Sequence, residues 1–147
     1  MQHNQYLLSS PALEFRSHNP MNWLILASAF IAGATTLIHA LVGGREVAAP
    51  LLRSQVSEEV RLTMYACWHM VTAALGLTSI ALLLVGLELI KENSLAQFLG
   101  ILWLLFAFVF LFVTMVLANP RGWFRFPQWT LLLPVGVLAL LGSLQHP

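Results

Sequence analysis

Long apolar stretches, separated by short polar segments, make up most of the 147-residue chain. They cover roughly residues 21–42, 62–90, 95–118 and 127–144. A membrane hydrocarbon core about 30 Å thick needs about 20 helical residues to cross it, and each stretch is near or above that length. A soluble domain of this size has too high a ratio of surface to volume to bury so much apolar area. The pattern predicts an all-α integral membrane protein.

The polar segments predict where the helices begin and end. After a polar N-terminal tail, four transmembrane helices are expected, over about 21–43, 58–91, 94–118 and 127–144, with the tail at 1–20 and the transmembrane domain at 21–147. The first helix is expected to end at Gly43 and Gly44, where a left-handed cap is easy. Ser57 is a good N-cap for the second helix, and the acids Glu58 and Glu59 would complement its dipole.

Connections this short favour antiparallel neighbours, so the chain is predicted to form an up-down four-helix transmembrane bundle. Four crossings place both termini on one side of the membrane. The basic residues then divide between the two faces, with Arg16 and Lys91 on the side of the termini and five on the other: Arg45, Arg53, Arg61, Arg121 and Arg125. The positive-inside rule places the five in the cytoplasm. We therefore expect a bacterial inner-membrane protein with both termini outside the cytoplasm.

Composition narrows the classes of function. Only 9% of residues are charged and the formal net charge is +1, which does not indicate a nucleic-acid partner. A single cysteine, Cys67, permits no intrachain disulfide. The sequence has no phosphate-binding loop, zinc-binding HExxH helix or CxxC pair, and no nucleophile beside a base. No catalytic residue is predicted, and a non-enzymatic protein is favoured.

Small and polar residues recur every three or four positions on the first three predicted helices, which indicates faces that pack inward. On the first helix they are Ser28, Ala32, Thr35, Thr36, His39 and Gly43. On the second they are Arg61, Tyr65, Trp68, His69, Thr72, Gly76 and Ser79, and on the third Gln97, Gly100, Ala107 and Thr114. We interpret most of these positions as helix-packing residues.

His39 and His69 are the strongest candidates for a site, because ionisable residues inside a membrane are costly. Both are predicted to lie at similar depths from the same face, on inward stripes of antiparallel neighbours. Further ligand contacts are expected at the same end: Arg45, Glu46, Arg61, Tyr65, Trp68, Asn119, Gln128 and Trp129.

Three interpretations of this cluster stay open. The histidines could be structural and hydrogen-bonded to neighbours. They could bind a haem or a metal ion between two helices, although zinc and copper usually need three or four ligands. The cluster could also receive a quinone or a lipid headgroup.

Within about residues 33–140 the chain has the pattern His39-x3-Gly43, then Pro50-Leu51, Trp68-His69 and Pro127-Gln128-Trp129. With this pattern the chain resembles an uncharacterised family of small bacterial four-helix integral membrane proteins. The family has no activity that the resemblance could imply. Its members tend to have Gly-Glu after the histidine, so the role of Glu46 stays open.

The predicted function is that of a non-enzymatic accessory or assembly subunit of a membrane complex, in contact with the lipid bilayer and other membrane subunits. The alternatives are a redox protein that uses His39 and His69, or a protein that binds a quinone or lipid headgroup. We favour a subunit because we expect a large exposed aromatic surface on the last two helices. It would be formed by Trp103, Phe106, Phe108, Phe110 and Phe112.

Overall fold

A computed structural model of the protein describes residues 21–117 and 128–145, and every regular element in these ranges is helical. The elements are α1 (Trp23–Ile38), the π-helix η1 (His39–Ala48), α2 (Ala49–Leu52), α3 (Glu58–Gly86), α4 (Asn93–Leu117) and α6 (Gln128–Leu144). Three helices in the described part are long and apolar enough to cross a membrane: Trp23–Leu52, Glu58–Gly86 and Asn93–Val116. The chain is thus all-α and compatible with a multi-pass membrane protein, and α6 is a shorter apolar helix.

The first helix does not end at Gly43 and Gly44 as the sequence predicted. It continues as η1 and α2 to Leu52, and none of the described glycines has a positive φ angle. The glycine pair is therefore not used as a left-handed cap. Pro50 is tolerated because it lies in the first turn of α2, where a missing N–H breaks no hydrogen bond of that short helix.

The second long helix begins at Glu58, as predicted, but ends at Gly86, five residues before the predicted Lys91. Glu88 has a φ of 59°, the left-handed conformation that closes a helix C-terminus. The N–H of Leu89 donates to the carbonyl of Leu84 across 3.0 Å, which captures one of the last carbonyls of the helix. The charged residues Glu88, Lys91 and Glu92 thus lie in the connection between α3 and α4.

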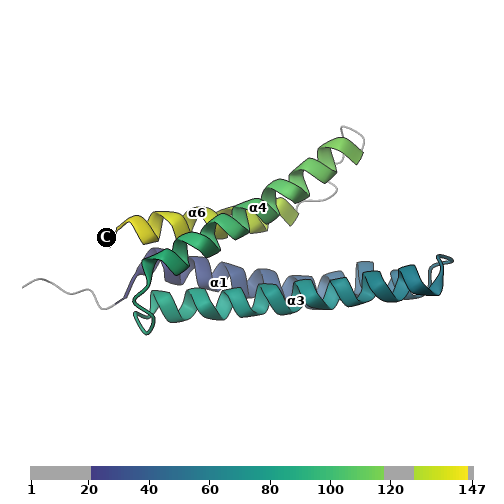
Figure 1. Cartoon of the computed structure of the whole chain (residues 1–147), viewed down its shortest axis with the longest axis horizontal. Helices are drawn as coiled ribbons and strands as arrows, with labels where there is room; N and C mark the ends of the chain where they lie inside the picture. The colour runs from purple at the N-terminus through teal and green to yellow at the C-terminus, as the bar shows by residue number, and fades with distance from the viewer. Residues whose placement is uncertain (1–20, 118–127, 146–147) are drawn as a thin grey trace, which may run out of the picture.

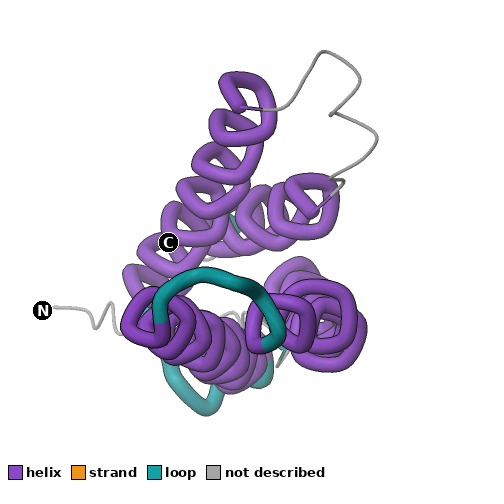
Figure 2. Tube along the Cα trace, turned by 90° about the vertical axis from the view of Figure 1, so that its right-hand side faces the viewer, coloured by secondary structure: helices purple, strands orange, loops and turns teal. Residues whose placement is uncertain are grey.

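The helices form two hairpins (Figures 1 and 2). The first hairpin is α1–η1–α2 packed against α3, and the second is α4 packed against α6. The two hairpins meet through α1 and α6. Beyond that contact the C-terminal half of α4 diverges from the first hairpin, so the molecule is joined at one end and open at the other (Figure 1).

Glycine permits the closest approach within the second hairpin. A Cβ atom on Gly136 would lie 2.8 Å from the Gly100 carbonyl oxygen, and a Cβ on Gly100 would lie 3.1 Å from the Gly136 carbonyl oxygen. The backbones of α4 and α6 thus touch each other at this pair. Small residues give membrane helices this kind of packing, in which dispersion contacts replace the hydrophobic effect.

Asn22 holds together the end at which the hairpins join. Its Oδ1 accepts from the N–H of Ile25 at 3.2 Å and caps α1, and its Nδ2 donates to the carbonyl of Gly142 in α6 at 2.8 Å. Its backbone N–H donates to the carbonyl of Gly86 at 3.0 Å. The residue is 3% exposed, so one buried asparagine connects three helices.

The core is concentrated at this joined end. The buried residues of α3 all fall within the last part of the helix: Leu75, Thr78, Ser79, Leu82, Val85 and Gly86. Trp103 of α4 is fully buried, which corrects the expectation that it contributes to an exposed aromatic surface. Phe106 is partly buried against the core, whereas Phe108, Phe110 and Phe112 are exposed as expected.

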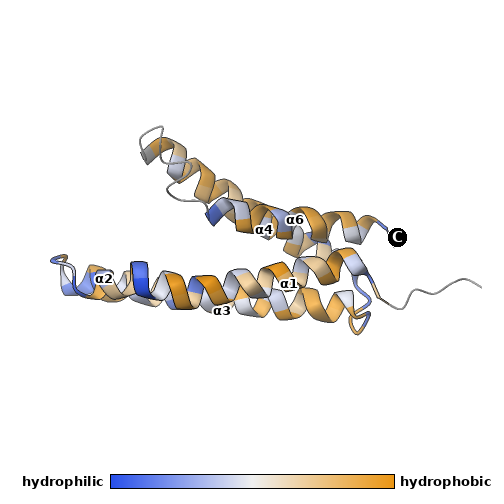
Figure 3. Cartoon of the chain, turned by 180° about the vertical axis from the view of Figure 1, so that it is seen from behind, coloured by the Kyte–Doolittle hydropathy of each residue, from blue (hydrophilic) through white to orange (hydrophobic). Residues whose placement is uncertain are grey.

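The residues 39–74, from η1 to the middle of α3, form an arm in which Ala48 alone is buried. The 29 residues of α3 span about 43 Å at 1.5 Å per residue, more than a hydrocarbon core of about 30 Å. If Gly86 lies at one edge of that core, Arg61, about 38 Å away, lies among the headgroups at the other. Figure 3 agrees, with hydrophilic colour gathering toward the α2 end.

Candidate functional site

Three residues of the predicted site region form one contact between the two helices of the arm. The imidazole of His39 stacks on the indole of Trp68, with ring centroids 4.0 Å apart and an interplanar angle of 14°. A Cβ on Gly43 would lie 2.7 Å from Cη2 of Trp68, so the indole fills the space that this glycine leaves open. His39 and Gly43 belong to η1, and Trp68 belongs to α3.

Trp68, and not His69, is the residue that α3 places against His39. Successive residues of an α-helix point about 100° apart, so the two neighbours cannot both face η1. The side chain of His69 is exposed and meets the ring of Tyr65 edge-on, with centroids 4.5 Å apart and an angle of 86°. Among the described residues, no ring contact joins the two imidazoles.

The His39 ring has an unused polar atom. Its Nε2 is buried and has no hydrogen-bond partner within the described part of the chain. The side chain as a whole is half-buried, and the stacked indole covers one face of the ring. The ring is therefore held in place by packing, and a bound group would have to approach from the side that Trp68 leaves open.

The other predicted contacts are distributed over different elements. Arg45 and Glu46 are exposed on η1 and line a shallow hollow of about 290 Å³ with Leu41 and Val42. Arg61 is half-buried on α3, one turn before Tyr65.

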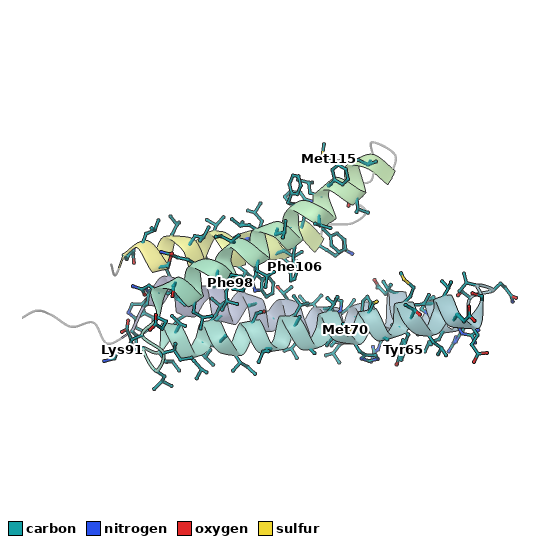
Figure 4. All side chains as sticks on the ribbon, in the orientation of Figure 1. Tyr65, Met70, Lys91, Phe98, Phe106 and Met115 are labelled. Carbon is teal, nitrogen blue, oxygen red and sulfur yellow. The ribbon has the colours of Figure 1, made fainter. Side chains whose placement is uncertain are left out.

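The remaining three predicted contacts lie on the second hairpin or beyond the described ranges. Gln128 and Trp129 open α6 in the second hairpin, and Asn119 lies outside the described residues. Figure 4 shows Tyr65 on the arm, apart from the diverging end of α4 at Met115.

The candidate site residues form two separate ring contacts in the described structure, one between His39 and Trp68 and one between Tyr65 and His69. Within residues 21–117 and 128–145, no three His, Cys, Asp or Glu side chains group so that they could hold a metal ion. Cys67, between the two pairs in sequence, is exposed. Trp68 thus packs α3 against η1. Tyr65 and His69 form a polar contact on the outside of α3.

Two residues that matter to this architecture were missed or misread in the sequence. Asn22 was not singled out, although an asparagine directly before an apolar run is a typical N-cap signal. Gly43 was assigned to a helix end because glycine pairs often terminate helices. Its role is a close approach to an aromatic ring of another helix, and the partner ring cannot be read from local sequence.

Comparisons with models of protein families, with curated proteins and with solved structures give no significant match.

Proposed function

We propose that the protein is a non-enzymatic accessory or assembly subunit of a membrane complex. The observation that carries the proposal is the exposed side chain of His69 on the open half of α3. His69 lies about 26 Å along the helix axis from Gly86, which is inside a hydrocarbon core of about 30 Å and about 4 Å from its other edge. Ionisable residues inside the core normally face protein or water and not lipid.

A neighbouring protein can reach His69, because its side chain is exposed in the open half of the arm. The hairpins diverge there, and none of the α3 residues from Glu58 to Ala74 is fully buried, although Trp68 is half-covered by its contact with η1. Exposed apolar side chains alone would not support a partner, because lipid tails solvate them well. An imidazole and a phenol ring on the same face do support one, because a helix of another subunit can supply hydrogen bonds that lipid tails lack.

In-cell photo-crosslinking tests the proposal. A benzoylphenylalanine replaces Met70, which adjoins His69 and is 70% exposed, and in the control it replaces Phe98, which is 63% exposed near the joined end. We expect a discrete protein adduct from position 70, reduced by His69→Ala, and none from position 98. Adducts with lipid alone at both positions, or with a second copy of this chain, would contradict an accessory subunit.

The proposal includes a membrane topology. We infer an up-down four-helix arrangement in a bacterial inner membrane, with both termini outside the cytoplasm. Antiparallel contacts between α1 and α3 and between α4 and α6 support it, as does the resemblance described above. A reporter that is active only in the periplasm, fused after Pro147, is expected to be active. An inactive fusion, together with an active cytoplasmic reporter at the same position, would reverse the orientation.

A further inference from the structure

The π-helix η1 is unusual for its length. It covers ten residues and has i→i+5 hydrogen bonding, and the N–H of Ala49 just after it donates to the carbonyl of Gly44. π-helices are rare and mostly occur as single-turn bulges inside α-helices. The preceding residues are ordinary α-helix, since the N–H of His39 donates to the carbonyl of Thr35. A specific contact is therefore needed to hold so long a segment in this conformation.

The Trp68 indole supplies a contact at the place where η1 begins. It stacks on His39, the first residue of η1, and it occupies the space above Gly43 one turn later. Gly44 is different, because a Cβ there would have nothing within 4 Å. Gly43 therefore has to be a glycine to leave room for the indole, whereas Gly44 does not.

We propose that residues 39–48 are a two-state segment, which Trp68 holds in the π-helical form by packing on His39 and Gly43. The alternative state is an α-helix through the same residues that bends at Pro50, because the proline ring meets the carbonyl of Glu46 in α-helical geometry. This inference goes beyond the proposed subunit role and does not depend on the identity of a partner.

Conversion would reorient the end of the arm. An i→i+4 helix has fewer residues per turn than an i→i+5 helix, so α2 would rotate about the helix axis relative to α1. The hollow beside Arg45 and Glu46 would change shape with it, because both residues belong to the converting segment. The five residues 53–57 between α2 and α3 would take up the change without a shift in α3.

A spin-label distance measures this rotation in the full chain, reconstituted in lipid nanodiscs. In a Cys67→Ser background, labels on Leu52→Cys and Ile80→Cys report α2 against α3, and both positions are exposed. A reference pair, Phe30→Cys with Ile80→Cys, reports α1 against α3 before η1 begins. A rotation of α2 moves its label by on the order of 5 Å, the radius of a helix with side chains.

Trp68→Ala and Gly43→Ala are expected to shift the 52–80 distance, or to add a second one, and to leave the 30–80 distance unchanged. Gly44→Ala is the matched control, because it raises helix propensity by the same amount without meeting the indole. We expect it to behave like the unmodified chain. The proposal is overturned if neither variant shifts the distance, or if Gly44→Ala shifts it as much as Gly43→Ala. Should Trp68→Ala not fold, Gly43→Ala decides.

Discussion

The side-chain amide of Asn22 donates a hydrogen bond to the backbone carbonyl of Gly142 across 2.8 Å, between the first and the last described helix. The same side chain caps α1 through its oxygen. Few side chains of this size carry both a donor and an acceptor, and Asn22 is almost fully buried. The contact therefore couples the start of α1 to the packing of the second hairpin on the first.

We expect Asn22→Ala to destabilise the fold by about 2 kcal/mol, since it removes a helix cap and the buried hydrogen bond to the carbonyl of Gly142, which then keeps the N–H of Gln145 as a donor at 3.2 Å. Asn22→Ser keeps a capping oxygen but is too short to reach Gly142, so about half of that loss is expected. The free energies are measured by reversible unfolding in detergent micelles. Equal stability of Asn22→Ala and the unmodified chain would show that the junction rests on apolar packing alone.

The close approach of α4 and α6 predicts a strong position dependence for glycine substitutions. Gly136→Ala places a Cβ 2.6 Å from the Cγ atom of Leu104 and close to the backbone of Gly100, so we expect a loss of about 1–3 kcal/mol from overpacking. Gly33→Ala meets nothing within 4 Å and should be neutral or stabilising by up to about 1 kcal/mol, because alanine favours helix. Thermal unfolding of both variants in one detergent checks the difference.

Much of the helical structure was predictable because it depends on local pattern. The apolar stretches and the acids at Glu58 and Glu59 correctly predicted where α3 begins. The stripe residues Ser28, Ala32 and Thr35 are buried as expected. Hydrogen bonds from Ser28 to the carbonyl of Val135 and between Thr36 and Ser79 confirm that this face packs inward. Periodicity identifies such faces whatever their partner is.

The arrangement of the site was not predictable from the same pattern. In a membrane helix that is apolar all round, periodicity does not say which of two adjacent residues faces a neighbour, so His69 was expected where Trp68 lies. The burial of Trp103 was missed for a related reason, since an aromatic residue suits either lipid or core. Both depend on how the hairpins pair, which is a property of the tertiary structure.

Glu88, just after the end of α3, allows a test of backbone strain. A non-glycine residue at positive φ costs roughly 1 kcal/mol, so Glu88→Gly should stabilise the fold by about that amount. Lys91→Gly is the control, because Glu88 is the one non-glycine residue with positive φ among the described residues. Lys91→Gly should be neutral or destabilising. A destabilised Glu88→Gly variant would mean that the carboxylate makes a contact that outweighs the backbone strain.

The length of the first hairpin predicts a boundary in chemical reactivity along the arm. In a Cys67→Ser background, Glu59→Cys should react quickly with a membrane-impermeant maleimide supplied to both sides of the membrane, because it lies about 40 Å from Gly86 and beyond the hydrocarbon core. Leu77→Cys and Phe30→Cys should not react, although these positions are 70% and 73% exposed in the chain itself, because lipid covers them. All three should react after denaturation in detergent. Equal rates at positions 59 and 77 in the intact membrane would mean that α3 does not span the bilayer.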